Sequence, residues 1–293
     1  MTLSKTIAVF GGNGFLGRKI CETGVQLGYN VISFSRSGEP PKEVISKPWL
    51  KNVHWEKANL MDPTSYKSKL KSVDTVVHSV GLLFENQSYK KSLNSNFSSL
   101  TDFTNFLKGS NPMKKDEGSS IEAIQRDSAV LLGDAFLEAQ EKEVMKKTKK
   151  PKVKKTSETP ETTEKPSETG KLPTFVYISA DNKPPIVPDA YLTSKREAEF
   201  ELSCKKGLRT IFMRPGFMYE VDHEGRTNAR DVLANFLKMG YFVKEGVVGD
   251  NIEFVNKIVR PAVSTDKVAF KLFEKLEEDA FEGVVELEDI VRY

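Results

Sequence analysis

The junction between the first apolar segment and a glycine-rich loop constrains this chain more than any other feature. Residues 6–10 read TIAVF, and the loop GGNGFLG follows at once over residues 11–17. Apolar side chains then recur at helical spacing until Gly28 stops the pattern. A short buried strand, a glycine turn and an amphipathic helix in this order predict the first unit of a parallel α/β sheet.

The rest of the chain continues this alternation of strand and helix. Short apolar runs that predict further strands lie at residues 29–35, 52–55, 74–81, 172–180, 208–216 and 283–287. Segments that predict helices lie at residues 62–72, 121–147, 189–207, 229–242 and 265–278. The order predicts an α/β fold, a doubly wound Rossmann sheet with helices on both faces.

We expect this Rossmann domain to comprise residues 1–139 and 173–219. Residues 220–293 are expected to form a small C-terminal α/β portion that serves a substrate or a partner. Arg260, in the stretch RPAVST, is expected to anchor that portion on the main domain.

The loop has the glycine spacing of a dinucleotide-binding turn. Gly11, Gly14 and Gly17 are three residues apart. In such a turn the first glycine bends the chain out of the strand, the second lets the backbone approach a pyrophosphate, and the third lets helix and strand pack closely. The helix N-terminus favours the anion. The flanking strand and helix favour dinucleotide binding over the alternative, a glycine turn that only packs.

The end of the second predicted strand bears on which dinucleotide binds. Arg36 stands between Ser35 and Ser37, where NAD-dependent enzymes usually carry an acidic residue for the ribose 2′-hydroxyl. A guanidinium suits a 2′-phosphate, so NADP(H) is favoured over NAD(H) as the cofactor. The alternative is a surface arginine in a loop.

The stretch YLTSK, residues 191–195, contains a tyrosine and a lysine four residues apart. On a helix, Tyr191 and Lys195 share one face. A nearby ammonium favours the tyrosinate, so Tyr191 could exchange a proton with a substrate, and Lys195 could hold the nicotinamide ribose. Ser179, at the end of the preceding strand, could hydrogen-bond a substrate carbonyl. The alternative is that Lys195 holds a ribose while Tyr191 packs beside it, without turnover.

Composition argues against several classes of function. Lys and Arg number 44 against 41 Asp and Glu, and this balance predicts no nucleic-acid binding. Two cysteines without a CxxC motif and three scattered histidines predict neither a disulfide framework nor a metal site, and His78 is expected to be a core residue. No apolar run could span a bilayer, and too few residues precede Thr6 for a cleavable targeting peptide.

Two segments interrupt the alternation. Residues 84–119 are polar with scattered phenylalanines, and we expect a long loop near the edge of the site. Residues 140–172 contain eight lysines between Lys142 and Lys155, then a run rich in Thr, Glu, Ser and Pro. This composition predicts a disordered insertion. The lysines could contact an anionic membrane surface or an acidic partner, but a solvated insertion is the simpler interpretation.

Five motifs in chain order carry a resemblance to a known family: VFGGNGFLG, DTVVHSVG, YISA, YLTSK and FMRPGFMY. They resemble the atypical or extended short-chain dehydrogenases/reductases over nearly the whole chain outside the two interrupting segments. Within that family the chain is similar to the mitochondrial branch that includes the 39 kDa accessory subunit of respiratory complex I. It is more similar still to fungal NAD(P)-binding proteins of coenzyme Q (ubiquinone) biosynthesis, through stretches such as SFSRSG, YLTSKREAEFEL and RPAVST.

The resemblance implies a seven-stranded Rossmann sheet and a set of cofactor contacts, which include Tyr191 and Lys195. The pyrophosphate would lie against Gly11, Gly12, Asn13, Gly14, Phe15, Leu16 and Gly17. The other implied contacts are Arg36 and Ser37 at the 2′-phosphate, Asn59 and Leu60 at the adenine, Ser79, Val80 and Gly81 beneath the cofactor, and Pro215 and Gly216 at the nicotinamide.

Two functions follow from the resemblance. The first is an NADPH-dependent oxidoreductase that reduces a quinone-type intermediate of ubiquinone biosynthesis, with Ser179, Tyr191 and Lys195 as catalytic residues. The second is a non-catalytic, NADPH-bound scaffold or regulatory subunit of a mitochondrial membrane-associated complex. Either would have other proteins of the coenzyme Q biosynthetic complex as partners and would contact the matrix side of the mitochondrial inner membrane.

Two departures from the family pattern bear on this choice. Asn59 replaces an aspartate that is common near the adenine, and the helix at IQRDSAVLL lacks the asparagine with which many members support a proton relay. The second departure weakens the expectation of turnover and leaves that of binding intact. A sugar-nucleotide epimerase or reductase is a third alternative, against which a preference for NADPH would count.

Overall fold

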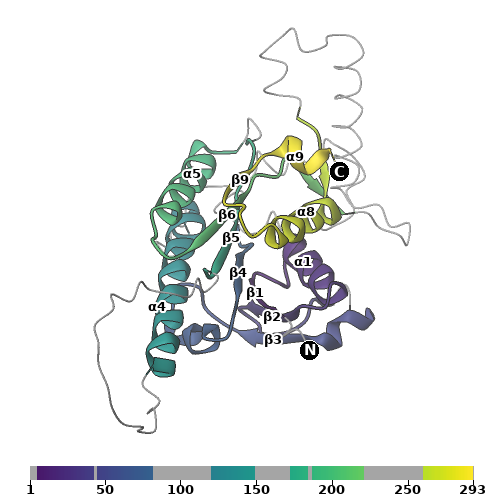
Figure 1. The fold of residues 1–293 in the computed structure, drawn as a ribbon. Helices are drawn as coiled ribbons and strands as arrows, with labels where there is room; N and C mark the ends of the chain where they lie inside the picture. Colours follow the sequence, from purple (N-terminus) through teal and green to yellow (C-terminus); the bar gives the residue numbers. More distant parts are fainter. Residues whose placement is uncertain are drawn as a thin grey trace, which may run out of the picture.

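Seven parallel strands form the centre of the molecule (Figure 1). The computed structural model describes residues 5–42, 45–81, 120–148, 172–183, 187–220 and 260–292. The strand order in the sheet is β3-β2-β1-β4-β5-β6-β9. The strands are β1 Thr6–Phe10, β2 Asn30–Ser35, β3 Val53–Lys57, β4 Thr75–His78, β5 Thr174–Ile178, β6 Arg209–Met213 and β9 Gly283–Val285. This order confirms the predicted doubly wound sheet, because the chain starts at β1, moves outward to β3 and then crosses to the other side.

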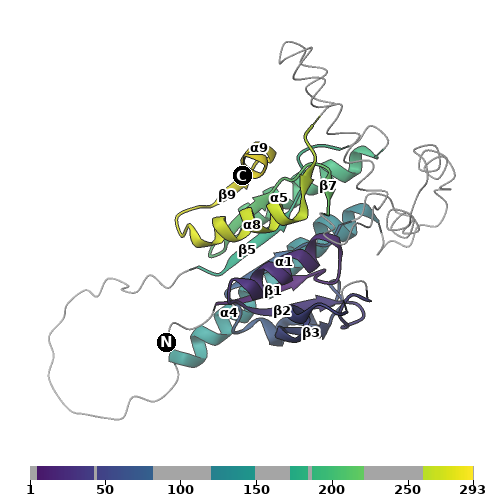
Figure 2. The ribbon, with the colours of Figure 1, turned by 90° about the vertical axis from the view of Figure 1, so that its right-hand side faces the viewer.

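Helices cover both faces of the sheet, as Figures 1 and 2 show. Helices α1 (Phe15–Gln26) and α8 (Thr265–Glu277) pack on one face, and α4 (Ser128–Thr148) and α5 (Asp189–Ser203) pack on the other. Side chains alternate along each strand, so Ile7 and Val9 of β1 join the first core while Ala8 and Phe10 join the second. A strand buried on both faces explains why TIAVF is continuously apolar.

Short elements fill the connections. They are η2 Pro48–Asn52, η3 Pro63–Ser65, η4 Lys67–Leu70, the π-helix η6 Ala123–Asp127, α9 Leu287–Val291, and the two-stranded parallel sheet of β7 Met218–Tyr219 and β8 Val263–Ser264. The helix predicted over residues 62–72 is therefore two 3₁₀ turns. Tyr66 separates them with non-helical dihedral angles, since its ring is buried in the core and its hydroxyl donates to the Leu60 carbonyl.

The C-terminal segment contributes to the central sheet and its core. Strand β9 pairs in parallel with β6 and is the outermost strand on that side. Helix α8 begins at the N-cap Ser264, whose hydroxyl accepts from the Lys267 N–H at 3.2 Å, and packs beside α1. The described part of the predicted 220–293 portion is thus continuous with the Rossmann sheet, while the division of the chain into domains stays a prediction.

Several predictions concern residues outside the described ranges. The loop at 84–119 and the helix at 229–242 lie there, as does the insertion beyond residue 148. Helix α4 continues to Thr148, so the first part of the predicted 140–172 insertion is helical. Across the described ranges, no helix combines the length and apolar character that crossing a membrane requires.

Candidate functional site

The predicted site residues meet at one edge of the sheet. Each predicted group follows a strand of the central sheet: residues 11–17 follow β1, 36–37 follow β2, 59–60 follow β3, 79–81 follow β4, Ser179 follows β5, and 215–216 follow β6. All these strands are parallel, so their carboxyl ends share one edge. Open α/β sheets bind ligands at this edge, near the point where the strand order reverses.

The glycine loop is held by close backbone contacts. Gly11 has φ +86°, its N–H donates to the Phe34 carbonyl at 2.8 Å, and its own carbonyl accepts from the Gly14 N–H at 2.8 Å. A Cβ on Gly17 would lie 2.1 Å from the Gly11 carbonyl oxygen, and one on Gly12 would lie 2.2 Å from Ser33 Oγ. Glycine is therefore required at 11 by conformation and at 12 and 17 by space.

The N-terminus of α1 lacks a side-chain cap. Its N-cap is Gly14, in an extended conformation, which makes no side-chain capping hydrogen bond. The partial positive charge of this terminus suits an anion. Among the atoms of the described residues, a Cβ on Gly14 would meet only the Gly11 carbonyl within 4 Å, so these residues leave the outer side of the turn open. These features fit a pyrophosphate at the loop.

The end of β2 joins the glycine loop through small polar side chains. Asn13 Nδ2 donates to Ser37 Oγ at 3.3 Å, and Ser35 Oγ lies 3.3 Å from the same atom. The Gly38 N–H donates to Ser35 Oγ at 3.0 Å, which closes a tight turn. Arg36 is exposed on this turn, beside the loop.

The adjacent predicted contacts lie in turns after β3 and β4. The Asn59 side chain accepts from the Met61 N–H at 3.2 Å, which gives it a role in shaping its own turn. Ser79 Oγ donates to the Phe10 carbonyl at 2.9 Å and so joins the end of β4 to the end of β1. Beyond it, Gly81 lies close to Lys195, since a Cβ on Gly81 would be 3.9 Å from Nζ.

Tyr191 and Lys195 share one face of α5, as the spacing predicts. Lys195 Nζ lies 5.6 Å from the centroid of the Tyr191 ring and 5.1 Å from that of the Tyr177 ring. It donates to the Ile178 carbonyl at 2.8 Å, and the residue is only 3% exposed. Burial lowers the pKa of Lys195 to about 7, with Glu199 opposing and Arg196 adding to the effect. The ammonium therefore titrates near neutral pH.

Ser179 lies beside a buried group of charged side chains. The residue is 3% exposed, and its hydroxyl accepts from Arg196 Nη1 at 3.0 Å. Its N–H donates to the Met213 carbonyl at 2.8 Å. The hydroxyl predicted to bind a substrate carbonyl thus has two partners within the protein, because it also hydrogen-bonds the Glu199 carboxylate.

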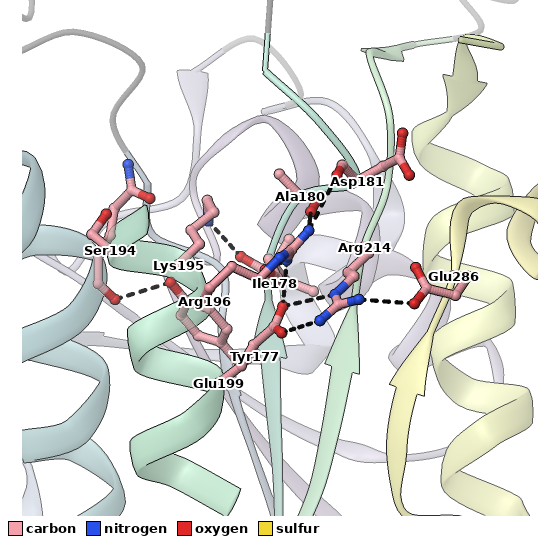
Figure 3. Close-up of polar contacts among 12 residues, drawn as sticks. Tyr177, Ile178, Ala180, Asp181, Ser194, Lys195, Arg196, Glu199, Arg214 and Glu286 are labelled. Carbon is pink, nitrogen blue, oxygen red and sulfur yellow. Dashed lines mark hydrogen bonds and ion pairs between the residues drawn. The ribbon is translucent and has the colours of Figure 1, made fainter. Parts of the chain in front are cut away.

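The charged group beside Ser179 is not apparent from the sequence. Glu199 of α5 accepts from Arg196 at 2.7 Å and from both Nε and Nη2 of Arg214, and Arg214 Nη1 donates to Glu286 at 2.8 Å (Figure 3). We name Arg196, Glu199, Arg214 and Glu286 the ion cluster. Burial alone would raise the pKa of Glu199, but the hydrogen bonds of Arg214 and Ser179 and the charges of Arg196 and Arg214 hold it below its usual range. No local spacing signals such a cluster, because its members come from three segments.

A second ion pair joins the C-terminal segment to the same corner. Arg260 donates from Nε and Nη2 to the Asp181 carboxylate at 2.7 and 2.6 Å, and Nη2 also lies 2.7 Å from Glu288. This geometry confirms that Arg260 anchors the C-terminal segment. Pro215 and Gly216 lie beside it: the Pro215 carbonyl accepts from the Asp181 N–H at 3.0 Å, and a Cβ on Gly216 would lie 3.0 Å from Leu287.

A neutral polar layer lies behind Lys195. His78 is fully buried, as predicted, and its Nε2 lies 2.9 Å from Ser128 Oγ. Burial and, secondarily, the charge of Lys195 lower its pKa to about 3, so the imidazole is neutral at physiological pH. Tyr177 donates to the Gln125 carbonyl at 3.0 Å. Gln125 belongs to η6, so a π-turn occupies the stretch that lacks the relay asparagine. Within the described ranges, His, Cys, Asp and Glu form no group that could hold a metal ion.

Comparison with known proteins agrees with this geometry. The model of the NAD dependent epimerase/dehydratase family matches residues 7–107. The aldohexose dehydrogenase of Thermoplasma acidophilum superposes with a TM-score of 0.53 at 15% identity, covering 99% of this chain and 95% of that one. The NAD complex of the enzyme WbmG from Bordetella bronchiseptica gives a TM-score of 0.53 at 13% identity, covering 97% and 73%. At these identities the likeness concerns the fold alone.

The chain has the fold of short-chain dehydrogenases. It belongs to one family with MIOREX complex component 2 of Saccharomyces cerevisiae, to which it is 35% identical over 292 residues. The match covers 98% of both chains, so the two proteins belong to one family over their full compared length.

The family description names NAD, which supports a nicotinamide dinucleotide as the cofactor. The residues present fit such a group. Gly11 and Gly17 form a cradle that a Cβ would fill, the α1 terminus has no side-chain cap, and Lys195 lies beside Gly81 at the inner end of the site.

Proposed function

We propose that this chain is an NADPH-binding oxidoreductase-like protein of mitochondrial ubiquinone biosynthesis, which reduces a quinone-type intermediate. One observation carries the biochemical part: the glycine turn, Lys195 and Tyr191 lie at the same edge of one sheet. Exposed Arg36, on the turn joined to the loop by Asn13 and Ser37, supports NADPH over NADH.

The chemistry assigned to each residue follows from its surroundings. The bound cofactor would supply a hydride to a carbonyl or ring carbon of the acceptor. Tyr191 would supply the proton to the acceptor oxygen, and Lys195, held by the Ile178 carbonyl, would favour the phenolate left behind and hold the ribose. The glycine loop would hold the pyrophosphate, and Ser79, Val80 and Gly81 would form the floor of the site. Asn59 and Leu60 would border the adenine, and Pro215 and Gly216 the nicotinamide.

The place in ubiquinone biosynthesis rests on similarity. The motifs shared with fungal coenzyme Q proteins support it. The full-length relative supports membership of a complex only, since by its name it is a component of the MIOREX complex. We therefore propose other proteins of the coenzyme Q biosynthetic complex as partners. The location on the matrix side of the mitochondrial inner membrane belongs to the same proposal.

A non-catalytic, NADPH-bound scaffold is the second candidate. The Ser179 hydroxyl accepts from Arg196 and hydrogen-bonds the Glu199 carboxylate, which favours this candidate, because a hydroxyl that donates to Glu199 does not donate to a substrate carbonyl. The absence of the relay asparagine from the stretch IQRDSAVLL points the same way. In this candidate Lys195 holds the ribose and Tyr191 packs beside it. A preference for NADPH over NADH counts against the third alternative, a sugar-nucleotide epimerase.

The first experiment identifies the nucleotide. We would purify the protein, release any bound nucleotide for mass spectrometry, and titrate NADPH and NADH by fluorescence. We expect NADPH to bind more tightly, and failure of both nucleotides to bind would refute the proposed function.

A second experiment separates the enzyme from the scaffold. Tyr191→Phe should leave NADPH affinity within about twofold, because the ring and Lys195 remain. In a strain that depends on this protein for ubiquinone synthesis, the enzyme predicts loss of complementation and the scaffold predicts full complementation. Tyr29→Phe is the control, since Tyr29 contacts Glu277 of α8 and lies in no part of the site.

A further inference from the structure

Two neighbouring basic side chains of α5 donate hydrogen bonds to consecutive residues at the end of β5. Lys195 Nζ donates to the carbonyl of Ile178, and Arg196 Nη1 donates to the hydroxyl of Ser179. Arg196 Nη2 donates to the carbonyls of Ala180 at 2.8 Å and Asp181 at 3.1 Å (Figure 3). Four consecutive residues are therefore fixed by two adjacent side chains of the helix that carries Tyr191.

Glu199 holds Arg196 in this position. It lies one turn further along α5, is 6% exposed, and accepts from Arg196 Nη1 at 2.7 Å. Its other partner, Arg214, follows β6 and also binds Glu286 near the start of α9. A guanidinium with this many fixed acceptors has little rotational freedom.

We propose that Arg196 and Glu199 are positioning residues for Lys195: they fix the strand end that holds its ammonium and set the balance of charge around it. This inference rests on the proposed function insofar as Lys195 serves a bound dinucleotide. It also assigns Ser179 to the positioning of the corner, since its hydroxyl accepts from Arg196 and hydrogen-bonds Glu199.

The charges around Lys195 allow a direct test. Among the described residues, the titratable groups near it are Tyr177 of β5, His78 of β4 and, on α5 itself, Tyr191, Arg196 and Glu199. His78 is neutral, and burial raises the pKa of Tyr177, so that phenol is neutral too. Arg196 disfavours the charged form of Lys195 and Glu199 favours it. Removing one or the other charge should therefore move the titration of Lys195 in opposite directions.

The measurement is the pH titration of the Lys195 ¹³Cε chemical shift in nucleotide-free protein, assigned by its absence from a Lys195→Met sample. Arg196→Gln should raise the midpoint by about one pH unit, and Glu199→Gln should lower it by a similar amount. Arg214→Gln leaves the carboxylate of Glu199 less neutralised, so it should raise the midpoint as well. This variant keeps the test decisive if Arg196→Gln does not fold.

The matched control is Glu197→Gln, on the same helix. Glu197 pairs with Arg126 and its side chain is 45% exposed, so the midpoint should not move. Shifts of the same sign in the Arg196 and Glu199 variants would indicate general loosening and would overturn the inference, as would two unchanged midpoints. NADPH titrations are run separately. A protein that binds no NADPH but shows opposite shifts refutes the proposed function alone.

Discussion

The glycine loop and the β5–α5 corner face the same site but are built in opposite ways. At residues 11–17 the structure depends on side chains that are missing, since a Cβ at Gly12 or Gly17 would overlap existing atoms. At residues 178–181 it depends on long charged side chains, Lys195 and Arg196, which reach back from α5. One part of the site is therefore defined by backbone geometry and the other by buried charge.

The difference determines how each part responds to change. Close backbone contacts contain no titratable group, so the loop should be insensitive to pH and salt. The corner combines a lysine that titrates near neutrality with a carboxylate shared by two guanidinium groups. A change of pH or salt should therefore alter both the geometry and the charge of the corner. The predictions below distinguish this sensitive corner from the insensitive loop.

The largest effect is expected at the loop. Gly17→Ala places a methyl group 2.1 Å from the Gly11 carbonyl oxygen and 2.8 Å from Ser79 Oγ, so the backbone must move. We expect a loss of about 3–4 kcal/mol in the free energy of unfolding, measured with urea, and loss of NADPH binding. The loss should be the same at pH 6 and pH 9.

The control for this prediction is Gly28→Ala. Gly28 has φ +82°, and no atom of the described residues lies within 4 Å of an added Cβ, so backbone strain of about 1 kcal/mol is expected and NADPH binding should persist. Equal losses in the two variants would show that the tight contact at Gly17 does not define the loop.

The next effect is expected at the corner. Glu199→Ala removes the carboxylate between Arg196 and Arg214 and leaves two partly buried guanidinium groups without it. Because these groups retain some exposure, we expect a loss of about 2–3 kcal/mol rather than the larger cost of a fully buried pair. Glu197→Ala, which breaks the exposed pair with Arg126, should cost less than about 1 kcal/mol. Thermal unfolding of both variants at low and high salt measures the difference between their losses of stability.

The same difference explains how much the sequence could predict. The glycine loop, the strands beside it and the Tyr191–Lys195 pair could be predicted, because each depends on residues close together in the chain. The ion cluster could not, since Glu199 and Arg214 are 15 residues apart and Arg214 and Glu286 are 72 residues apart. Charged residues at such separations have no spacing rule.

Local patterns missed details that tertiary packing decides. The segment IQRDSAVLL is helical, as its periodicity predicts, but residues 123–127 form a π-turn that the periodicity did not signal, and the Gln125 carbonyl of this turn accepts from Tyr177. Ser179 stands at the expected strand end, but its engagement by Arg196 depends on a side chain from another element. Sequence therefore located the candidate site and did not predict the partners of its buried polar groups.

A smaller effect, with the opposite sign, is expected from Lys195→Met. The folded-state pKa of Lys195 is lowered from 10.5 to about 7, so between these values the unfolded chain binds more protons and stability rises with pH. Lys195 thus costs stability most at or below pH 7, and the cost fades as pH approaches 10.5. The variant should gain about 1–2 kcal/mol at pH 7, after loss of the bond to Ile178, and should show no gain near pH 10.

Lys19→Met is the control for this sign. Burial lowers the pKa of Lys19, but Glu22 and Asp266 outweigh burial and the pKa is raised, so this charge stabilises the fold. Its removal should lower the free energy of unfolding at pH 7. If the free energy of unfolding fell in both Lys195→Met and Lys19→Met, the charge of Lys195 would be compensated in the folded protein.

The smallest effect tests whether charge also serves the loop side of the site. Arg36→Gln removes an exposed guanidinium, so the free energy of unfolding should change by less than about 0.5 kcal/mol. NADPH affinity should fall about tenfold, corresponding to about 1.4 kcal/mol, while NADH affinity stays constant because NADH lacks the 2′-phosphate. The difference in NADPH affinity between Arg36→Gln and the unchanged protein should shrink as the salt concentration rises, since an exposed charge pair is screened. Lys51→Gln, an exposed cation in η2 at the start of β3, lies at the opposite edge of the sheet and should alter neither affinity. Parallel losses of NADPH and NADH affinity in Arg36→Gln would place the guanidinium at a part of the dinucleotide common to both, and the preference for NADPH would then need another source.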